Sequence, residues 1–528
     1  MPNAPPRSRR SQQQCMQYGL CLFLLALLSP VGALPPSADG APTNHSRVLI
    51  VGAGAAGYAA AARLLEHGWS DFTILEAEPR IGGRIHSVRE AGTILEMGAE
   101  WVHGENVVYE MAAPLQLLGR RWSDSDAEVS VVWSGGVEAD IEDVMLLYNT
   151  SIDIHDAGAH GELANYNGSF GEWFLEKFNK RLQSLDRRPP PDLVEAFLDA
   201  YQKGVGLEEG AHSWNELSGR GMTEYEESRG ENEGLFWKRD GFISVFDLLT
   251  KRFPNSSQEL PVRQRVLLDS EVSAIRWGER VRSELPAPPV VVELSHGGKH
   301  TADIVLVTVS LGVLKHRDIF DPPLPPRKMK AVENLGFGTV EKVFLHFTEP
   351  WWPSDVAGYE PLVREEDRET FKREHPEFAA HGEWAHALSA FYVDQHAPRS
   401  AVLSTWITGE PARLMESYTD SELMMGCVKW LQMFVGQNLT IPQPAGFRRS
   451  SWWSNPHFKG SFSYISLDSD RADVRAAHLA EPILDAHDQL AILFAGEATH
   501  GRHYTSVHGA IESGQREADR ILKEYKKK

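Results

Sequence analysis

A glycine-rich segment followed by an acidic residue is the part of the sequence whose spacing points most directly to chemistry. The run Gly52-Ala53-Gly54-Ala55-Ala56-Gly57 has the form G-x-G-x-x-G, and Glu76 follows Gly57 by 19 residues. In such a segment Gly52 permits a tight turn, Gly54 lets the backbone approach a pyrophosphate, and Gly57 lets a helix pack closely on a strand. The carboxylate of Glu76 can accept hydrogen bonds from ribose hydroxyls. The segment predicts a dinucleotide site, and the alternative is a glycine-rich turn without a ligand.

Three stretches around this segment have the patterns of the elements that must position it. Residues 48–51 and 72–75 are short apolar runs, typical of buried parallel strands, and the alanine-rich residues 55–66 favour a helix. In such a βαβ unit the start of the helix faces the phosphates with its free N–H groups. The unit predicts an α/β fold with a Rossmann-like domain. Further strands are expected at residues 290–294, 304–309 and 490–495, and a further helix at about 507–523.

A second glycine pair with an arginine distinguishes a flavin from a nicotinamide cofactor. Gly82-Gly83-Arg84 begins six residues after Glu76, and a nicotinamide dehydrogenase has no need of this segment. In flavoproteins with the pattern E-x-x-x-x-x-G-G-R the arginine reaches the dinucleotide, and the glycines allow close approach of the backbone. At these residues the sequence resembles the flavin amine oxidase family, which includes monoamine oxidases, polyamine oxidases and lysine-specific histone demethylases.

The resemblance to this family continues through ordered segments from residue 47 to about 520, an order that is hard to obtain by chance. It is strongest to the branch of animal spermine and acetylpolyamine oxidases. It implies that the FAD-binding Rossmann-like domain is joined by a mixed α+β substrate-binding domain. The matching segments are residues 96–104, 308–315, 338–347, 453–464, 494–499 and 507–514.

The resemblance also implies roles for individual residues. Lys342 is implied to be catalytic and to hold a water against flavin N5, and the alternative is a strand lysine that faces solvent. His103 is implied to be catalytic and to contact the substrate, and the alternative is a histidine hydrogen-bonded within its loop. Further substrate contacts are implied for Glu216, Tyr464 and Tyr504. The implied cofactor contacts are Gly52, Gly54, Ala55, Ala56, Gly57, Glu76, Gly82, Gly83, Arg84, Gly98, Ala99, Glu100, Trp101, Val272, Glu497, Ser506 and Val507.

The chain departs from its relatives at two positions that bear on the substrate. Related enzymes carry an acid immediately before Trp214, where this chain has Ser213, so the carboxylate that anchors the substrate is left open. Ser506 occupies a position that is aromatic in some relatives. Monoamine oxidases attach the flavin to a cysteine in this region, and residues 501–509 contain none, so non-covalent FAD is expected.

The implied reaction converts a polyamine, either spermine, spermidine or an acetylated form, with O2 and water into an aminoaldehyde, a shorter amine and hydrogen peroxide. One alternative is a secreted L-amino-acid oxidase, which needs an arginine clamp for the substrate carboxylate. Another is a catalytically silent member of the family that binds FAD. A histone demethylase is disfavoured by the predicted signal peptide described below and by the lack of a long helical insertion.

Charge and chain length limit the partners and suggest two domains. The net charge of -20 argues against a nucleic-acid partner, which would need a basic stripe, and is compatible with a cationic substrate. No part of the sequence after the N-terminus is apolar enough to span a membrane, and the oligomeric state is left open. The FAD-binding domain is expected at residues 47–125, 238–325 and 445–528, and the substrate-binding domain at residues 126–237 and 326–444.

The N-terminus has the features of a secretory signal peptide. Arginines at residues 7–10 precede an apolar run at 18–28 and small residues at 31–33, which predicts a signal over residues 1–33 and a linker at 34–46. The apolar run is short for a membrane span. A secreted, N-glycosylated protein is expected, because N-x-Ser/Thr sequons begin at Asn44, Asn149, Asn167, Asn255 and Asn438.

Overall fold

The computed structural model describes residues 44–90, 92–119, 128–230, 234–278, 290–380, 383–394, 400–437 and 439–525. Residues 44–528 belong to one compact unit. The predicted signal peptide, most of the predicted linker and Asn438 lie outside the described residues. None of the helices in this described part of the chain is long and apolar enough to cross a membrane.

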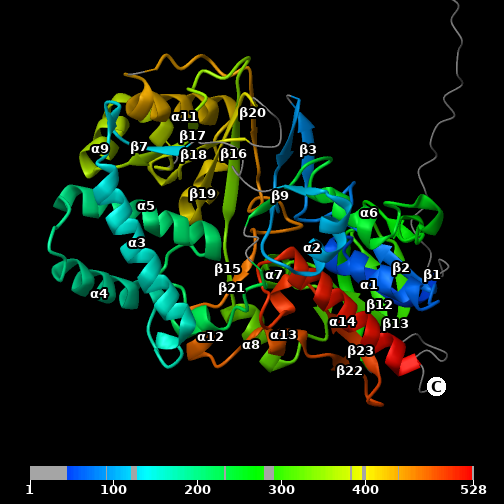
Figure 1. Ribbon diagram of the computed structural model, residues 1–528. Helices are drawn as coiled ribbons and strands as arrows, with labels where there is room; N and C mark the ends of the chain where they lie inside the picture. Colours follow the sequence, from blue (N-terminus) through cyan, green and yellow to red (C-terminus); the bar gives the residue numbers. More distant parts are fainter. Residues whose placement is uncertain are drawn as a thin grey trace, which may run out of the picture. The chain divides into compact units, whose positions relative to one another are not determined.

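A nine-stranded sheet holds the glycine segment at one edge (Figure 1). Its strands are β1 (Asn44–Val51), β2 (Phe72–Leu75), β10 (Val266–Leu267), β11 (Val272–Trp277), β12 (Val290–Leu294), β13 (Lys299–Val307), β14 (Phe320–Asp321), β22 (Ile483–Leu484) and β23 (Leu490–Phe494). β10, β2, β1, β13 and β23 run parallel in that order, so their carboxyl ends meet at one edge. Ligands of open parallel sheets bind at this edge.

A seven-stranded, mostly antiparallel sheet carries Lys342. Its strands are β7 (Glu128–Trp133), β8 (Val137–Glu138), β16 (Val340–His346), β17 (Val356–Leu362), β18 (Phe391–Val393), β19 (Val402–Thr408) and β20 (Gly446–Arg449), in the order β20-β16-β19-β18-β17-β7-β8. Lys342 therefore lies on a strand with a partner on each side. Three small sheets complete the strands found among the described residues: β3 (Ser87–Glu90) with β4 (Thr93–Glu96), β5 (Trp101–Val102) with β9 (Leu235–Trp237) and β6 (Leu118–Gly119), and β15 (Gly336–Phe337) with β21 (Ser463–Tyr464).

Helices cover both faces of the nine-stranded sheet. The α-helices are α1 (Ala55–Glu66), α2 (Val107–Ala112), α3 (Ile141–Ala157), α4 (Phe170–Gln183), α5 (Pro191–Glu209), α6 (Val245–Leu249), α7 (Leu311–His316), α8 (Pro326–Asn334), α9 (Glu365–Glu374), α10 (Gly409–Met415), α11 (Asp420–Val435), α12 (Leu467–Arg471), α13 (Ala476–Ala480) and α14 (Val507–Tyr525). α1 and α14 lie side by side on one face (Figure 1), and a Cβ on Gly514 would overlap the backbone of Ala56 at their contact. α7, α8 and α13 contribute to the core on the other face.

The predicted core elements are present, with small differences where strands end. Helix 55–66 and strands 72–75 and 290–294 have the predicted bounds, and the predicted helix at about 507–523 is α14. The strand expected at 304–309 instead ends at Val307, where the side-chain hydroxyl of Thr308 donates to the Val51 carbonyl at 2.8 Å. The strand expected at 490–495 ends one residue early.

The boundary of the predicted linker is wrong. Residues 34–46 were expected to precede the first strand, but β1 already begins at Asn44, which pairs with His300 of β13. β13 extends back to Lys299, so it offers partners to residues that carry no apolar strand pattern of their own. Strand pairing across the sheet therefore overrides the local composition here.

The strands of the two large sheets come from different parts of the chain. The nine-stranded sheet is built from the ranges expected to bind FAD, together with the first residues of β1. The seven-stranded sheet is built from the ranges expected to bind substrate, except that β20 comes from residues 446–449 and pairs with β16. The division into two domains stays a prediction, because residues 44–528 form one compact unit.

Candidate active site

The glycine segment leaves the start of α1 open at the carboxyl edge of the parallel strands. α1 begins at Ala55 directly after Gly54, and no described side chain caps it. A Cβ on Gly54 would have no described atom within 4 Å, whereas a Cβ on Gly57 would overlap the Gly52 carbonyl. Gly57 is therefore needed for packing, and Gly54 borders free space. The uncapped N–H groups and positive end of α1 are suited to a pyrophosphate.

Glu76 is a buried carboxylate held beside this segment. Its Oε2 accepts from the Ala53 N–H at 2.7 Å and its Oε1 from the Glu78 N–H at 2.8 Å. Burial raises the pKa of Glu76, although the two backbone hydrogen bonds favour its charged form. The carboxyl group is therefore fixed at the end of β2, where it can accept hydrogen bonds from a ribose.

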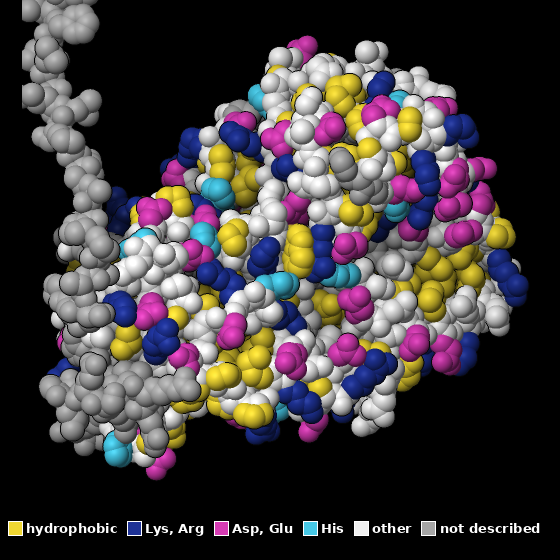
Figure 2. All heavy atoms as spheres, turned by 180° about the vertical axis from the view of Figure 1, so that it is seen from behind, with side chains coloured by type: hydrophobic (Ala, Val, Ile, Leu, Met, Phe, Trp, Pro, Cys, Tyr) yellow, Lys and Arg dark blue, Asp and Glu magenta, His cyan; other side chains and the backbone are white. Residues whose placement is uncertain are grey.

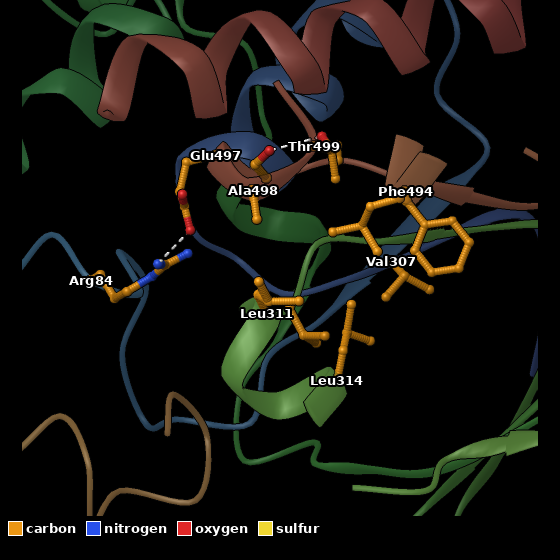
Figure 3. Close-up of a pocket in the computed structure, with 12 residues that line it drawn as sticks. Arg84, Val307, Leu311, Leu314, Phe494, Glu497, Ala498 and Thr499 are labelled. Atoms are coloured by element: carbon orange, nitrogen blue, oxygen red, sulfur yellow. Dashed lines mark hydrogen bonds and ion pairs between the residues drawn. The ribbon is translucent and has the colours of Figure 1, made fainter. Parts of the chain in front are cut away.

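The second glycine pair folds back onto the first. Gly82 has a φ of 112° and bridges to Gly54, so the two glycine segments lie in contact. Arg84, which follows the second glycine pair, donates to the Glu497 carboxylate at 2.8 Å and to the Ser461 carbonyl at 2.7 Å. Figure 3 shows this ion pair at the edge of a pocket. The pocket is lined further by Val307, Leu311, Leu314, Phe494, Ala498 and Thr499 (Figure 3).

Glu497 connects this pair to the loop that enters α14. Its carboxylate accepts from the Ser463 hydroxyl at 2.6 Å and from the Thr505 N–H at 3.1 Å. Ser506 then caps α14, because its hydroxyl oxygen accepts from the Gly509 N–H at 3.0 Å. The predicted cofactor residues Ser506 and Val507 are thus positioned by the same network that holds Arg84.

Two further predicted cofactor segments have different surroundings. Ala99 N–H donates to the Arg84 carbonyl at 3.2 Å, and a Cβ on Gly98 would overlap that carbonyl. Gly98 is therefore needed for packing against Arg84. Val272 is buried at the start of β11, in the nine-stranded sheet. Its contact with FAD stays a prediction.

These residues fit an FAD molecule. The open start of α1 suits the pyrophosphate, the carboxylate of Glu76 suits a ribose, and Arg84 adds a cation at the same edge. Each individual contact stays a prediction. Cys427, the one cysteine among the described residues, is fully buried in the core beside the seven-stranded sheet, and burial raises the pKa of its thiol. Such a thiol is inert. Non-covalent attachment of the FAD stays a prediction.

Lys342 is buried, so the alternative of a solvent-facing strand lysine is wrong. Its side chain is 8% exposed, and its ammonium nitrogen lies 2.5 Å from the Glu100 carboxylate. The same nitrogen lies 5.7 Å from the ring centre of Trp101 and 5.6 Å from that of Trp406. Trp406 is directly opposite Lys342 in the pairing of β16 with β19. Sequence reasoning found Lys342, Glu100 and Trp101 but not Trp406.

The backbone of Lys342 is fixed from the other side of its strand. Its N–H donates to the Ser450 hydroxyl oxygen at 2.7 Å, and the Ser450 hydroxyl donates to the neighbouring carboxyl of Glu341. Glu341 also accepts from the Trp452 N–H at 2.7 Å. Burial, and next the neighbouring Glu416, hold the pKa of Glu341 well above its usual range. A buried, hydrogen-bonded carboxyl group therefore fixes the position of β16.

The predicted substrate residues form one direct pair. The Tyr464 hydroxyl donates to the Glu216 carboxylate at 2.8 Å, so the structure brings these two together. Tyr504 is buried and packs edge-on against Tyr225, with ring centres 5.4 Å apart. The His103 ring is exposed and lies edge-on to Trp101 at 6.4 Å. His103 therefore lies near the segment that pairs with Lys342.

Glu209 is a further acidic residue near these side chains, and sequence reasoning missed it. It ends α5, and desolvation by burial, together with Glu208, raises its pKa to about 8. After burial, the charge of Glu209 is the largest cause of the raised pKa values of Tyr225 and Tyr504, so its carboxyl lies close to both phenols. Two consecutive glutamates before a glycine, at residues 208–210, mark the end of a helix, and this pattern could have drawn attention to Glu209.

The end of α5 lies against the start of the lysine strand. A Cβ on Gly338, two residues before β16, would overlap the Gly210 carbonyl. This contact places the last turn of α5, with Glu209, close to the strand that carries Lys342. The last turn of α5 therefore lies beside the residues that lead into β16, and Lys342 follows Gly338 by four residues.

A histidine pair anchors the loop before α14. His500 and His503 both donate to one carboxylate oxygen of Glu512, at 3.1 and 2.6 Å. Burial works against the charge of Glu512, but these hydrogen bonds lower its pKa to about 2. His500 Nδ1 also accepts the His503 N–H at 2.8 Å, which folds the loop. The loop that carries Tyr504 and Ser506 is thereby attached to α14.

Similar proteins of known fold share this architecture. A solved structure of wild-type putrescine oxidase bound to putrescine covers 91% of this chain and 100% of its own, with a TM-score of 0.62 and 18% identity. A triple mutant of the same enzyme has a TM-score of 0.63 over the same share of both chains. The α/β fold with its Rossmann-like region is therefore that of the flavin amine oxidases.

Similar sequences cover almost the whole chain. The peroxisomal N(1)-acetyl-spermine/spermidine oxidase of Bos taurus is 32% identical over 508 residues, which are 91% of this chain and 96% of the relative. Polyamine oxidase 1 of Oryza sativa subsp. japonica is 31% identical over 540 residues, 91% of this chain and 98% of the relative. The family described as Flavin containing amine oxidoreductase matches residues 55–522. The chain therefore belongs to the flavin-containing amine oxidoreductases and is an FAD-dependent amine oxidase.

Proposed function

We propose that the amine oxidised by this chain is a polyamine, either spermine, spermidine or an acetylated form. The observation that carries the proposal is that the carboxyl groups of Glu209 and Glu216 lie among tyrosine side chains, on or beside segments that contact residues 336–338 at the entry to the lysine strand. Carboxylates and aromatic faces are the protein groups that bind cationic nitrogens. Two relatives support the choice, since one is named as an acetyl-spermine/spermidine oxidase and one solved enzyme binds putrescine.

The proposed reaction consumes the amine, O2 and water and gives an aminoaldehyde, a shorter amine and hydrogen peroxide. Bound FAD supplies the acceptor for the hydride that leaves the carbon next to the nitrogen. Glu209 holds a cationic nitrogen away from the reacting carbon. Lys342 handles the proton that moves at the reacting end, and the rings of Trp101 and Trp406 exclude bulk water around it.

The contacts of Arg413 favour an amine over an amino acid as the substrate. An L-amino-acid oxidase needs an arginine that is available for the substrate carboxylate. Arg413 lies near Glu216, but it is already bonded to Thr339 at 3.2 Å and to His212 at 3.1 Å. Its guanidinium also stacks on the Trp453 ring at 3.6 Å. This arginine is therefore engaged in packing.

A screen of hydrogen peroxide release tests the proposed substrate class. Purified holoprotein is incubated with spermine, spermidine, their acetylated forms, putrescine and a set of L-amino acids. We expect release with at least one polyamine and none with the amino acids. Release with an amino acid alone would replace the proposal by the amino-acid oxidase alternative.

Glu209→Gln is expected to weaken polyamine binding and to remove its pH dependence. The carboxyl group of Glu209 has a pKa of about 8, so its ionised fraction rises about tenfold per pH unit below that value. KM for spermine should therefore fall as the pH rises from 6 to 8, while the nitrogens of the substrate stay largely cationic. In the variant KM should be raised at pH 8 and should not change with pH in this range.

The control for this experiment is Glu195→Gln, which changes an exposed glutamate of the same helix. It should keep the KM of the wild type and its dependence on pH. A Glu209→Gln enzyme with an unchanged KM profile would show that Glu209 does not contact the substrate.

We propose further that the protein is secreted and N-glycosylated. The proposal is supported by the signal pattern at residues 1–33 and by the exposure of three sequon asparagines, Asn149, Asn167 and Asn255. Expressed in animal cells, the protein should appear in the medium, shortened at its N-terminus and reduced in size by a glycosidase. Retention in the cytosol with Met1 intact would contradict the proposal.

A further inference from the structure

Glu100 and Lys342 form an almost fully buried ion pair. The Glu100 side chain is 15% exposed and the Lys342 side chain 8%, and their charged atoms lie 2.5 Å apart. The two residues come from separate elements, because Glu100 precedes β5 while Lys342 lies in the middle of β16. The loop before β5 must therefore be placed against the seven-stranded sheet for the pair to form.

Stability alone is a weak reason for such a pair. Removing two charges from water costs several kcal/mol per ion, and apolar residues of similar size often give equal stability. The surroundings would suit an apolar pair, since the Lys342 nitrogen lies 5.6–5.7 Å from the centres of the Trp101 and Trp406 rings, which contact each other. The pair fixes one thing that apolar packing would not, namely the position of the ammonium group.

The ion pair limits where the end of a flexible side chain can lie. A lysine side chain has four rotatable bonds, and a carboxylate at its end selects one arrangement among many. The backbone of Lys342 is held separately by Ser450, so that Glu100 is the described group that orients the nitrogen. The two tryptophan rings lie beside the charged end, and Glu100 sets its direction.

We propose that Glu100 is a positioning residue that acts through Lys342. This role replaces the direct contact with FAD that the resemblance implies for Glu100. This inference rests on the catalytic role proposed for Lys342. Glu100 holds the ammonium group in one position, where it can take part in proton movement beside the reacting end of the amine. Its loss should slow the reaction steps and should leave the affinity for FAD unchanged.

A double-mutant cycle in the holoenzyme tests this role. Glu100→Gln keeps the size of the side chain but removes its charge, and we expect kcat to fall roughly tenfold, within the range for coupled neighbours. KM for spermine should change less than kcat, and FAD content should match the wild type. In the Lys342→Met background, Glu100→Gln should cause no further loss, because its effect passes through the lysine. Glu100→Asp keeps the charge and should recover part of the rate.

Control and contradicting results separate this inference from the proposed function. Glu110→Gln, an exposed glutamate of α2, should behave as the wild type. The positioning role would be overturned by equal fold losses from Glu100→Gln in both backgrounds, by a wild-type kcat in Glu100→Gln, or by a loss of FAD. Each of these outcomes would leave the proposed role of Lys342 intact as long as the Lys342→Met enzyme is slow. If Lys342→Met itself has full activity, the proposed catalytic lysine is wrong, and the inference falls with it.

Discussion

The Lys342→Met enzyme is expected to bind FAD normally and to turn over at least about 100-fold more slowly, the range for loss of one positioned acid–base group. Methionine keeps a similar length and can pack beside Trp101 and Trp406, but it removes the charge and all three donors. Substrate affinity should change less than turnover, because the lost interaction is felt mainly in the reaction steps. Steady-state kinetics with spermine and the flavin absorbance per chain measure both effects.

A matched control for this variant is Lys299→Met. Lys299 is also a strand lysine, but its side chain is 58% exposed and pairs with Glu293 at the surface. It should keep wild-type turnover. Wild-type turnover in Lys342→Met would remove Lys342 from the mechanism, and a variant without FAD would show a structural role.

Gly54→Val is expected to fold normally and to bind FAD more weakly. Gly54 has extended backbone angles that valine adopts readily, and its missing side chain borders free space. A branched side chain there would occupy the place of the pyrophosphate beside the start of α1. We expect the affinity for FAD to fall about tenfold to 100-fold, which corresponds to about 1.4–2.8 kcal/mol. Circular dichroism follows the fold, and titration of the apoprotein with FAD follows the affinity.

Two other glycines supply the comparison for Gly54→Val. Gly57→Ala should lower both the melting temperature and the FAD affinity, because its Cβ overlaps the Gly52 carbonyl. Gly204→Ala, in an exposed and open position of α5, should bind FAD as the wild type does. A Gly54→Val protein that keeps full FAD affinity would show that the glycine segment does not contact the pyrophosphate.

Local patterns were sufficient to predict the α/β core. Apolar strands, the alanine-rich helix and the glycine segment follow one another within about 30 residues, so their arrangement depends little on distant parts of the chain. The start of β1 was missed because Asn44 has no strand pattern and is paired only through His300, far along the sequence. The same limit explains the β20 strand, which joins the seven-stranded sheet through β16.

The candidate site was predicted only in part, because several of its contacts join distant segments. The resemblance supplied Lys342 and Glu100 separately, but their ion pair spans 242 positions of the chain. Trp406 faces Lys342 only through the register of β16 with β19. Glu209 is brought beside the entry to β16 by a contact between Gly210 and Gly338, which no local pattern predicts.

The sequence predicts the net charge of the protein but not how the charged side chains are distributed over its surface. The sequence has 73 acidic and 53 basic residues. Figure 2 shows acidic and basic side chains interspersed over the described residues of one face, with apolar side chains between them. We therefore expect local carboxyl groups, such as those of Glu209 and Glu216, to supply the contacts that bind a cationic substrate.

Anaerobic mixing of the purified holoprotein with polyamines tests the central claim most directly. The claim is that this chain uses its FAD to oxidise a polyamine. We predict that spermine, spermidine or an acetylated form bleaches the visible flavin absorbance without O2, and that admission of O2 restores the colour with formation of hydrogen peroxide. Folded, FAD-loaded protein whose absorbance is unchanged by every polyamine would contradict the claim, and bleaching by L-amino acids alone would assign the FAD to a different substrate.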